Sequence, residues 1–316
     1  MTLPVHQPRK RMPVSIANAP VSYGAFELTV GFLPLVPDAG RVLDEVADAG
    51  YAGIDLGPPG YLGDENSLAG ALRERGLSLA GGYLPLPLTD DELSPDTLEE
   101  VDTLLATFAA AADTVGDLVA KPTLADAGSE ARAARIGRAP ADEDEGLDDR
   151  GWRRLCRNLQ LVADRCRRAG FEPTFHHHAG THVEAPWEID RVLDGTDVDL
   201  CLDTGHLVVG GGDPLEELGR LGSRVNHVHL KDVRRDVVRA IVEEAAPVTE
   251  IWRRKAFCRL GDGDLEVVQF IEELRRMEFS GWMVVEQDRL PETEADVAEM
   301  IDDQRDNRVY LSDRGW

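Results

Sequence analysis

Short apolar runs alternate with amphipathic segments along most of the chain, and this alternation restricts the possible folds more than any other feature. The first pair is the apolar run Val14–Ala17, an expected strand, and an expected helix that Pro37 opens and Gly50 ends. Strands that alternate with helices in this way form parallel sheets, because each helix returns the chain to the same edge. The other expected strands are Gly53–Leu56, Leu77–Gly82, Asp117–Lys121, Pro173–His178, Asp199–Leu202, Val225–Leu230 and Gly281–Val285.

The number of strand–helix units favours a closed barrel over an open sheet. Eight parallel strands close into a (β/α)8 TIM barrel. An open doubly wound sheet would be favoured by a GxGxxG turn after an early strand, and the sequence contains none. We therefore predict an α/β fold, with a single TIM-barrel domain over residues 13–316 and an active site at the C-terminal ends of its strands. The other expected helices are Ser67–Arg75, Thr97–Gly116, Trp152–Ala169, Trp187–Leu193, Pro214–Leu221, Leu265–Met277 and Glu292–Val309.

Three stretches depart from the regular alternation. Residues 1–12 are expected to form a disordered lead-in, because polar residues interrupt the apolar stretch after the basic run Gln7–Arg11 and no signal peptide results. An insertion near residues 126–149 has little apolar periodicity, and it is either a lid over the site or a mobile surface segment. Residues 233–263 contain helical pieces and the turn Gly261–Asp264, and their structure is ambiguous.

The charge balance and composition disfavour several classes of partner. The 316 residues carry a formal net charge of −25, so the chain lacks the Lys and Arg needed to displace counterions from a nucleic acid. No apolar run reaches the roughly 18 residues of a membrane-spanning helix. The four cysteines have no CxxC spacing, which indicates reduced thiols and a cytoplasmic protein. A small-molecule partner is therefore expected, with neither nucleic acid nor membrane.

Histidines gather in one part of the sequence. Of the eight in the chain, seven lie between His176 and His229, and they occur where expected strands end. Imidazole and carboxylate side chains at successive strand ends are suited to binding a metal ion. The three clusters are Thr174–His182, Leu202–His206 and His227–Asp232.

Side-chain alternation along the strands selects which cluster members face the barrel mouth. Successive residues point to opposite faces of a strand, so His176 and His178 share one face. His177 shares the other face with the apolar Phe175. We therefore expect the side chains of His176 and His178 to point into the mouth.

The same alternation applies to strand seven, where His227, His229 and Lys231 share one face. Asp203 ends strand six. A carboxylate there could cap a helix, but we expect the capping role to fall to Asp213 instead.

Strands five to eight together offer one mixed set of nitrogen and oxygen ligands without thiolate. Glu286 directly follows the expected eighth strand, where an acidic residue is unfavourable for a strand and useful in a site. Such a set suits Mn²⁺ or Co²⁺, and also Mg²⁺, Fe²⁺ or Zn²⁺. The expected metal ligands are His176, Asp203, His229 and Glu286.

Several motifs resemble those of a known superfamily. Asp203–His206, His227–Asp232 and Val284–Glu286 resemble motifs of the xylose-isomerase-like sugar isomerase and epimerase barrels, which include endonuclease IV. Within that superfamily, four further stretches resemble inosose dehydratase (2-keto-myo-inositol dehydratase). They are His176–Thr181, Gly211–Pro214, Gly261–Gly263 and Glu286–Asp288. The resemblance implies a metal-dependent TIM-barrel enzyme of carbohydrate metabolism, and self-association is common in the family.

The resemblance has one departure with a mechanistic consequence. The superfamily usually has Glu at the strand-five metal position, and this chain, like the dehydratase-like branch, has His176. Sugar epimerases use that Glu and the strand-eight Glu as paired bases, so elimination is favoured here. The expected activity is a metal-dependent lyase that dehydrates a keto-polyol, such as an inosose, through an enolate. The alternatives are a sugar or keto-sugar isomerase/epimerase, and a lyase that eliminates an aglycone from an oxidised sugar.

The expected roles of individual residues come from this chemistry. The metal would bind a ketone oxygen and stabilise the enolate as a Lewis acid. Glu286 or His178 would remove the α-proton, and His206 or Lys231 would protonate the departing hydroxyl. Candidate substrate contacts are Asn18, Glu27, Tyr61, His227 and Arg235. A turn residue is the alternative for Asn18, and a solvated loop charge is the alternative for Arg235.

Two other functions would use the barrel differently. An endonuclease IV-type activity would need three metal ions and contact with a polyanion, which the net charge of −25 disfavours. A non-catalytic barrel stabilised by metal would bind a ligand without changing it.

Overall fold

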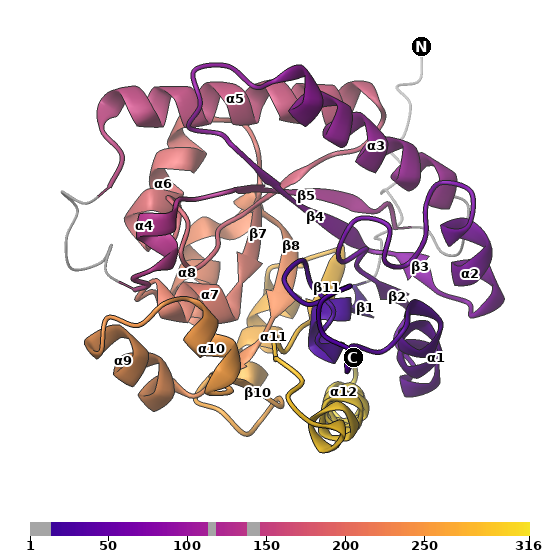
Figure 1. The fold of residues 1–316 in the computed structure, drawn as a ribbon. Helices are drawn as coiled ribbons and strands as arrows, with labels where there is room; N and C mark the ends of the chain where they lie inside the picture. Colours follow the sequence, from indigo (N-terminus) through magenta and orange to yellow (C-terminus); the bar gives the residue numbers. More distant parts are fainter. Residues whose placement is uncertain (1–13, 113–117, 138–145) are drawn as a thin grey trace, which may run out of the picture.

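Parallel strands form a barrel, and helices surround it (Figure 1). The structure, a computed structural model, describes residues 14–112, 118–137 and 146–316. The disordered lead-in expected over residues 1–12 therefore lies outside the described residues. No helix in the described part of the chain is long and apolar enough to cross a membrane.

The barrel closes through its third strand, which has two parts. The strand order is β3-β2-β1-β11-β8-β7-β6-β5-β4, and only Ala80 separates β3 (Ser78–Leu79) from β4 (Gly81–Leu86). The Ala80 N–H donates to the Ile54 carbonyl at 2.9 Å, and the Ala80 carbonyl accepts from the Lys121 N–H at 3.0 Å. Both ends of the sheet therefore meet at one strand, which gives the eight-position barrel that the alternation predicts.

The remaining strands confirm the predicted order and correct two boundaries. The fourth strand, β5, is Lys121–Asp126, so the bounds Asp117–Lys121 expected for it were wrong. Small and polar residues such as Thr123 and Ala125 hide this strand in the sequence, although both are fully buried. The third strand extends to Leu86, beyond the expected end at Gly82. The other strands are β1 (Ser15–Asn18), β2 (Gly53–Ile54), β6 (Thr174–His176), β7 (Leu200–Asp203), β8 (Val225–Leu230) and β11 (Trp282–Val285).

The helices begin where the sequence supplies caps. Ser94 accepts a hydrogen bond from the Thr97 N–H at the start of α3, and Asp148 accepts one from the Gly151 N–H at the start of α5. The helices are α1 (Ala39–Ala49), α2 (Leu68–Glu74), α3 (Pro95–Ala111), α4 (Glu130–Ala133), α5 (Asp149–Arg168), α6 (Pro186–Gly195), α7 (Thr204–Val209), α8 (Pro214–Leu221), α9 (Arg235–Glu243), α10 (Thr249–Arg253), α11 (Val267–Arg276) and α12 (Glu294–Ser312), with short 3-10 turns at Pro20–Tyr23 and Gly222–Arg224.

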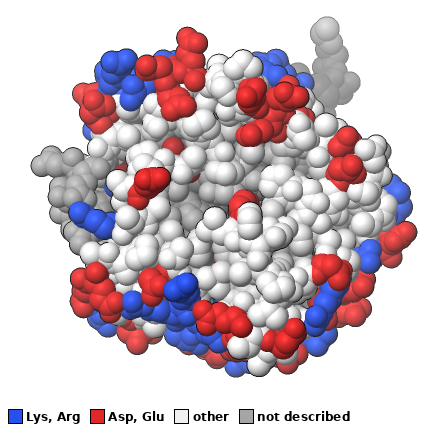
Figure 2. All heavy atoms as spheres, viewed as in Figure 1, with Lys and Arg blue, Asp and Glu red and all other residues white. Residues whose placement is uncertain are grey.

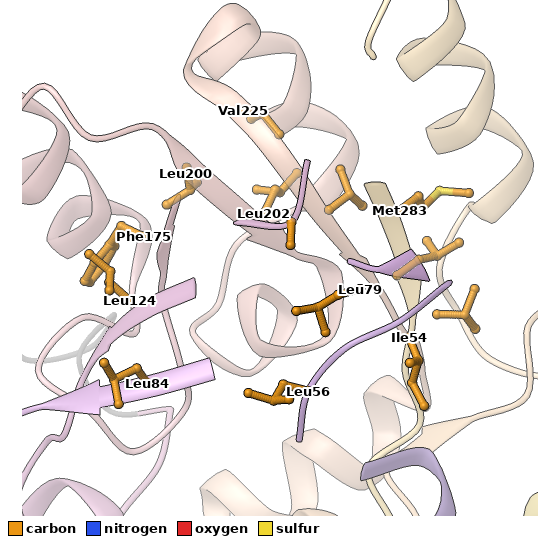
Figure 3. Packing of buried hydrophobic residues seen from close by; sticks show 14 of the residues in the cluster. Ile54, Leu56, Leu79, Leu84, Leu124, Phe175, Leu200, Leu202, Val225 and Met283 are labelled. Carbon is orange, nitrogen blue, oxygen red and sulfur yellow. The ribbon is translucent and has the colours of Figure 1, made fainter. Parts of the chain in front are cut away.

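The main core packs the outer face of the barrel against the helices (Figure 3). Leu124, Phe175 and Leu200 are register partners on β5, β6 and β7, and all three are fully buried. Burial of one such side chain stabilises the fold by about 1.5–3 kcal/mol. Because side chains alternate along a strand, the outward position of Phe175 directs the neighbouring His176 into the barrel. The packing of the core thus fixes which histidine reaches the site.

The ambiguous stretch from 233 to 263 forms a small unit of its own. β9 (Asp232–Val233) pairs antiparallel with β10 (Phe257–Cys258), and α9 and α10 lie between them in the chain. Val238, Ile251 and Phe257 belong to a separate apolar cluster that also contains Ile136. This unit therefore packs against the segment that comes after β5.

The described part of the expected insertion is ordered and packed. After β5 the chain forms α4, and Ile136 is fully buried in the cluster with Ile251. Gly137 donates its N–H to the Glu184 carboxylate at 3.1 Å. Residues 138–145 lie outside the described residues, so a lid function of the insertion near 126–149 stays a prediction.

Candidate active site and metal centre

A cavity of ≈ 180 Å³ lies at the C-terminal ends of the strands. It opens on a largely uncharged face of the molecule, and acidic and basic side chains gather around the edge of that face (Figure 2). Six side chains from five strands and the residues that follow them line it: Asp55, Tyr83, His176, His229, Lys231 and Glu286. The cavity therefore lies where a TIM barrel places its active site.

Three expected metal ligands lie close together, and two of them, His229 and Glu286, line this cavity. Asp203, His229 and Glu286 each offer a donor atom, and these atoms lie within 4.8 Å of one another. Nδ1 of His229 lies 3.1 Å from Oε2 of Glu286 and 3.6 Å from Oδ2 of Asp203. Asp203 and His229 are register partners on β7 and β8, and Glu286 follows β11, so the parallel sheet itself aligns them.

His176 joins the same group from β6. Its Nε2 lies 3.3 Å from Oδ2 of Asp203, and its Nδ1 has no hydrogen-bond partner among the described residues. His178 also lines the cavity, but its Nδ1 lies 2.8 Å from the carbonyl of Ala179. The fully buried His177 is absent from the cavity lining, in agreement with the alternation along the strand. Of the two inward histidines, His176 is the one placed to bind a cation.

The ammonium group of Lys231 contacts three carboxylates. Its Nζ lies 2.6 Å from Oδ2 of Asp203, 2.5 Å from Oε2 of Glu286 and 3.4 Å from Oδ1 of Asp288. All four side chains are at least nine-tenths buried. Buried carboxylates so close together require a cation, because their mutual repulsion and desolvation are otherwise very unfavourable.

Burial and neighbouring charges set the protonation of these groups. Burial lowers the pKa of His178 to about 3, and it also lowers the pKa of His206 well below its ordinary value. Burial disfavours the charged form of Lys231, but Asp203 and Asp288 raise its pKa above its ordinary value. Burial likewise raises the pKa of Glu286, but His229 and Lys231 lower it overall. The two histidines are therefore neutral near pH 7, while Lys231 is an ammonium and Glu286 a carboxylate.

The donor set fits a divalent cation. It combines imidazole nitrogens with carboxylate oxygens. Three of its buried ring nitrogens, Nδ1 of His176 and both nitrogens of His229, have no hydrogen-bond partner in the part of the chain that the structure describes. Mixed nitrogen and oxygen ligands suit Mn²⁺, Co²⁺, Fe²⁺ or Zn²⁺. The structure thus brings together the four residues that the sequence suggests as ligands.

Asp203 also corrects an expectation about helix capping. Its Oδ1 accepts a hydrogen bond from the His206 N–H at 2.9 Å and caps α7, a helix that the sequence did not suggest. Asp213 caps α8 in the same way, as expected. One oxygen of Asp203 therefore holds the strand–helix turn, and the other faces His176 and Lys231.

The candidate proton donor His206 lies on this turn. Its ring is 3.8 Å from the ring of His178, centroid to centroid, and its Nε2 is 3.7 Å from Oδ2 of Asp288. Both histidines line the cavity. The sequence-based candidates for proton transfer, Glu286, His178, His206 and Lys231, thus share one chamber.

The candidate substrate contacts are less well grouped. Glu27 lines the cavity. Asn18 is fully buried, where its amide group donates to Gln304 and its oxygen accepts from the Ala19 N–H. The Tyr61 hydroxyl donates to the Pro37 carbonyl at 2.6 Å. Exposed Arg235 lies 3.4 Å from Asp213. Asn18, Tyr61 and Arg235 are outside the cavity lining, because each is committed to a contact elsewhere.

His227 lies one inward position deeper than His229. It is fully buried, absent from the cavity lining, and 5.3 Å from the His229 ring between centroids. A contact with substrate would therefore have to pass His229, so the expected substrate-binding role of His227 does not match its position.

Several residues that line the cavity were not among the site residues expected from the sequence. Asp55 follows the two-residue strand β2, and its Oδ2 lies 3.5 Å from Nε2 of His229. Tyr83 lies on the extended part of the third strand and packs edge-on against His176. Trp252, from the stretch that had no clear pattern, packs against Phe26 with 5.0 Å between ring centroids. A carboxylate inside the expected strand Gly53–Leu56 was the available signal for Asp55.

Known proteins share both the sequence pattern and the fold of this chain. The family model described as "xylose isomerase-like TIM barrel" matches residues 43–304. An inosose dehydratase of Geobacillus kaustophilus is 33% identical over 255 residues, which are 79% of this chain and 80% of that protein.

Two solved structures share the fold. One is the IolI protein with a zinc atom, with a TM-score of 0.67, 14% identity and coverage of 96% of this chain and 99% of that one. The other is 3-keto-D-glucoside 4-epimerase from E. coli, with a TM-score of 0.63, 15% identity and coverage of 95% and 99%. At these identities the two structures support the fold only, and the reaction has to be inferred from the residues of the site.

Proposed function

Because this chain belongs to the xylose isomerase-like TIM barrel family, we propose that it is a metal-dependent lyase that dehydrates a keto-polyol, such as an inosose, through an enolate. The observation that carries the proposal is the shared chamber of His176, Asp203, His229 and Glu286 with the ammonium of Lys231. The inosose dehydratase relative at 33% identity supports the same class of substrate.

His176, Asp203, His229 and Glu286 would hold the divalent cation. When bound, the cation would supply Lewis-acid stabilisation of the negative charge that develops on a ketone oxygen. The protein adds a fixed, buried set of ligands, since His229 and Asp203 sit on adjacent paired strands. We propose Mn²⁺ or Co²⁺ as the preferred ions, and Zn²⁺, Fe²⁺ and Mg²⁺ as alternatives.

The protonation states of the side chains in the chamber indicate which of them can accept a proton and which can donate one. Glu286 is a carboxylate and His178 is neutral, so either can accept the α-proton. His206 is also neutral and holds no extra proton to donate. Lys231 keeps its ammonium form beside Glu286 and is therefore the better donor to the departing hydroxyl. Removal of a proton and donation of another yield one molecule of water and a carbon–carbon double bond.

The walls of the cavity suit a small cyclic polyol. Lys231, His178 and Asp288 contribute polar atoms to the lining, and Phe26 and Trp252, whose rings pack together, contribute aromatic surface. A cyclic polyol has hydroxyl groups at its edge and C–H groups on its ring faces, so it presents both kinds of surface. The cavity volume of ≈ 180 Å³ favours one such ring over a polymer.

A conversion assay tests the proposal. The metal-loaded protein is mixed with keto-inositols and keto-sugars, and ultraviolet absorbance is followed for an enone. We expect enone formation with a keto-inositol, and its loss after chelation of the metal. Absence of any product with every keto-polyol, in protein that contains metal, would contradict the proposed activity.

An epimerase of keto-sugars is the second candidate. The observation that favours it is the presence of two proton acceptors in one cavity, because His178 and Glu286 both line it. His178 and Glu286 would then act on opposite faces of the substrate. Retention of all oxygen atoms in a product of inverted configuration would select this reaction over dehydration.

A further inference from the structure

We propose that the barrel binds a second divalent cation beneath the first, between Asp55, His227 and Nε2 of His229. The proposal rests on the first cation of the proposed function, because His229 takes part in both sites. It is suggested by ring nitrogens and a carboxylate oxygen that the first site leaves unused.

The two nitrogens of His229 face two different groups of ligands. Nδ1 points to the first site, 3.1 Å from Oε2 of Glu286 and 3.6 Å from Oδ2 of Asp203. Nε2 points the other way, 3.5 Å from Oδ2 of Asp55. An imidazole ring in this orientation can bind one cation through each nitrogen, and the ring proton then passes to solvent.

His227 supplies the independent observation. It is fully buried, and neither ring nitrogen has a hydrogen-bond partner among the described residues. Oδ1 of Asp55 is also buried without a partner there. Buried polar groups are normally hydrogen-bonded, so the unpartnered ring of His227 beside the Asp55 carboxylate calls for an occupant.

The geometry of this group suits a cation. Asp55, His227 and His229 each offer a donor atom, and these atoms lie within 4.8 Å of one another. Metal–ligand bonds of about 2.0–2.1 Å separate the ligand atoms of a tetrahedral site by roughly 3.4 Å, close to the 3.5 Å between Asp55 and His229. Two imidazoles and one carboxylate favour Zn²⁺ or Co²⁺ over Mg²⁺, which prefers oxygen ligands.

Metal stoichiometry tests the second site. The full-length protein is freed of metal, dialysed to equilibrium against Co²⁺ or Zn²⁺ alone, and analysed for metal per chain. We expect two equivalents in the unchanged protein and one in His227→Gln, which keeps the ligands of the first site. His182→Gln is the matched control, because His182 pairs with Asp126 outside both sites, and it should keep two.

The number of metal equivalents per chain shows whether both sites, one site or neither binds metal. One equivalent in the unchanged protein, even at saturating metal, overturns the second site and leaves the first and the proposed function intact. No bound metal overturns both. Two equivalents in a folded His227→Gln protein also overturn the assignment. If His227→Gln does not fold, Asp55→Asn replaces it, and the result in the unchanged protein remains decisive by itself.

Discussion

Lys231 and Glu286 form the most consequential contact in the candidate site. Their charged groups lie 2.5 Å apart in a buried chamber, with Asp203 beside them. A proton donor and a proton acceptor held this close to one substrate can act on neighbouring carbon atoms. Elimination of water needs this combination, since one group takes the α-proton and another releases the hydroxyl.

Replacement of Glu286 by Gln removes the proposed base. We expect Glu286→Gln to lower exchange of the substrate α-proton with solvent deuterium by about 10²–10⁴-fold, the usual contribution of a positioned base. The exchange is followed by NMR in D₂O, and metal content is measured in the same samples because Glu286 is also a proposed ligand. Unchanged exchange would exclude Glu286 as the base and leave His178.

Replacement of Lys231 separates the two proton transfers. In metal-loaded Lys231→Met we expect water elimination to fall by at least about 10²-fold, while α-proton exchange persists, because the variant loses the donor and keeps the base Glu286. Lys255→Met is the control, since Lys255 is partly exposed and pairs with Asp296 and Glu299 outside the cavity. Full elimination activity in Lys231→Met would show that another group donates the proton to the departing hydroxyl.

At the scale of elements, Arg132 connects the segment after β5 to α6 and to the loop that precedes it. Arg132 of α4 contacts both carboxylate oxygens of Glu188 at 3.1 Å and the Thr181 carbonyl at 2.8 Å. Oε2 of Glu184 lies 3.6 Å from Nη2 of Arg132, and the Glu184 carboxylate accepts hydrogen bonds from the N–H groups of Gly137 and Gly180. These contacts tie the segment to the loop that carries His178, so the segment supports the site from outside.

Removal of Arg132 leaves two buried carboxylates without their cation. We expect Arg132→Met to lower the free energy of unfolding by about 3–5 kcal/mol, as is usual when one partner of a buried ion pair is lost. Arg150→Met is the control, because that arginine is 69% exposed and solvent screens its pair with Asp91, so we expect a much smaller loss. Chemical denaturation measures both, and equal losses would contradict a special role for Arg132.

Glu184 should make this support depend on pH. Burial raises its pKa to about 7, above the value of the unfolded chain, so the folded state binds the proton more tightly between these values. Stability should therefore fall as pH rises from about 4.5 through 7, by on the order of 2–3 kcal/mol. In Glu184→Gln we expect a flatter pH profile of unfolding. Identical slopes in the two proteins would contradict the raised pKa.

At the scale of the whole molecule, the sequence predicts the barrel and the four ligands because both depend on regular alternation. Strand–helix repetition sets the eight positions, and the alternation of His176 and Phe175 sets the inward face. Asp203, His229 and Glu286 are then aligned by parallel register. These features follow from the order of residues within each strand and from the parallel pairing of the strands.

The parts that the sequence did not predict depend on packing between distant elements. β2 has two residues, too few for a periodic signal, so Asp55 could not be placed beside His229. The register of β5 is set by its pairing with β4, where Gly81 lies opposite Lys121. Tyr61 and Arg235 looked available for substrate because their partners, Pro37 and Asp213, are brought to them only by folding.

Metal loading should stabilise the whole barrel, because the ligands come from strands far apart in the chain. A ligand at 100 times its Kd adds about 2.7 kcal/mol to the folded state, so we expect Tm to rise by several degrees on addition of Mn²⁺, Co²⁺ or Zn²⁺. Chelation should reverse the shift. A Tm that does not respond to any of these ions would contradict the metal centre.

The central claim, that this chamber removes water from a keto-polyol, is tested most directly by the product NMR spectrum in D₂O. Metal-loaded protein is incubated with an inosose, and the spectrum is compared with that of the protein after chelation. We predict a product that has lost one molecule of water and carries a carbon–carbon double bond next to the ketone. A product with all oxygen atoms retained and one inverted carbon would contradict dehydration and assign the chamber to epimerisation.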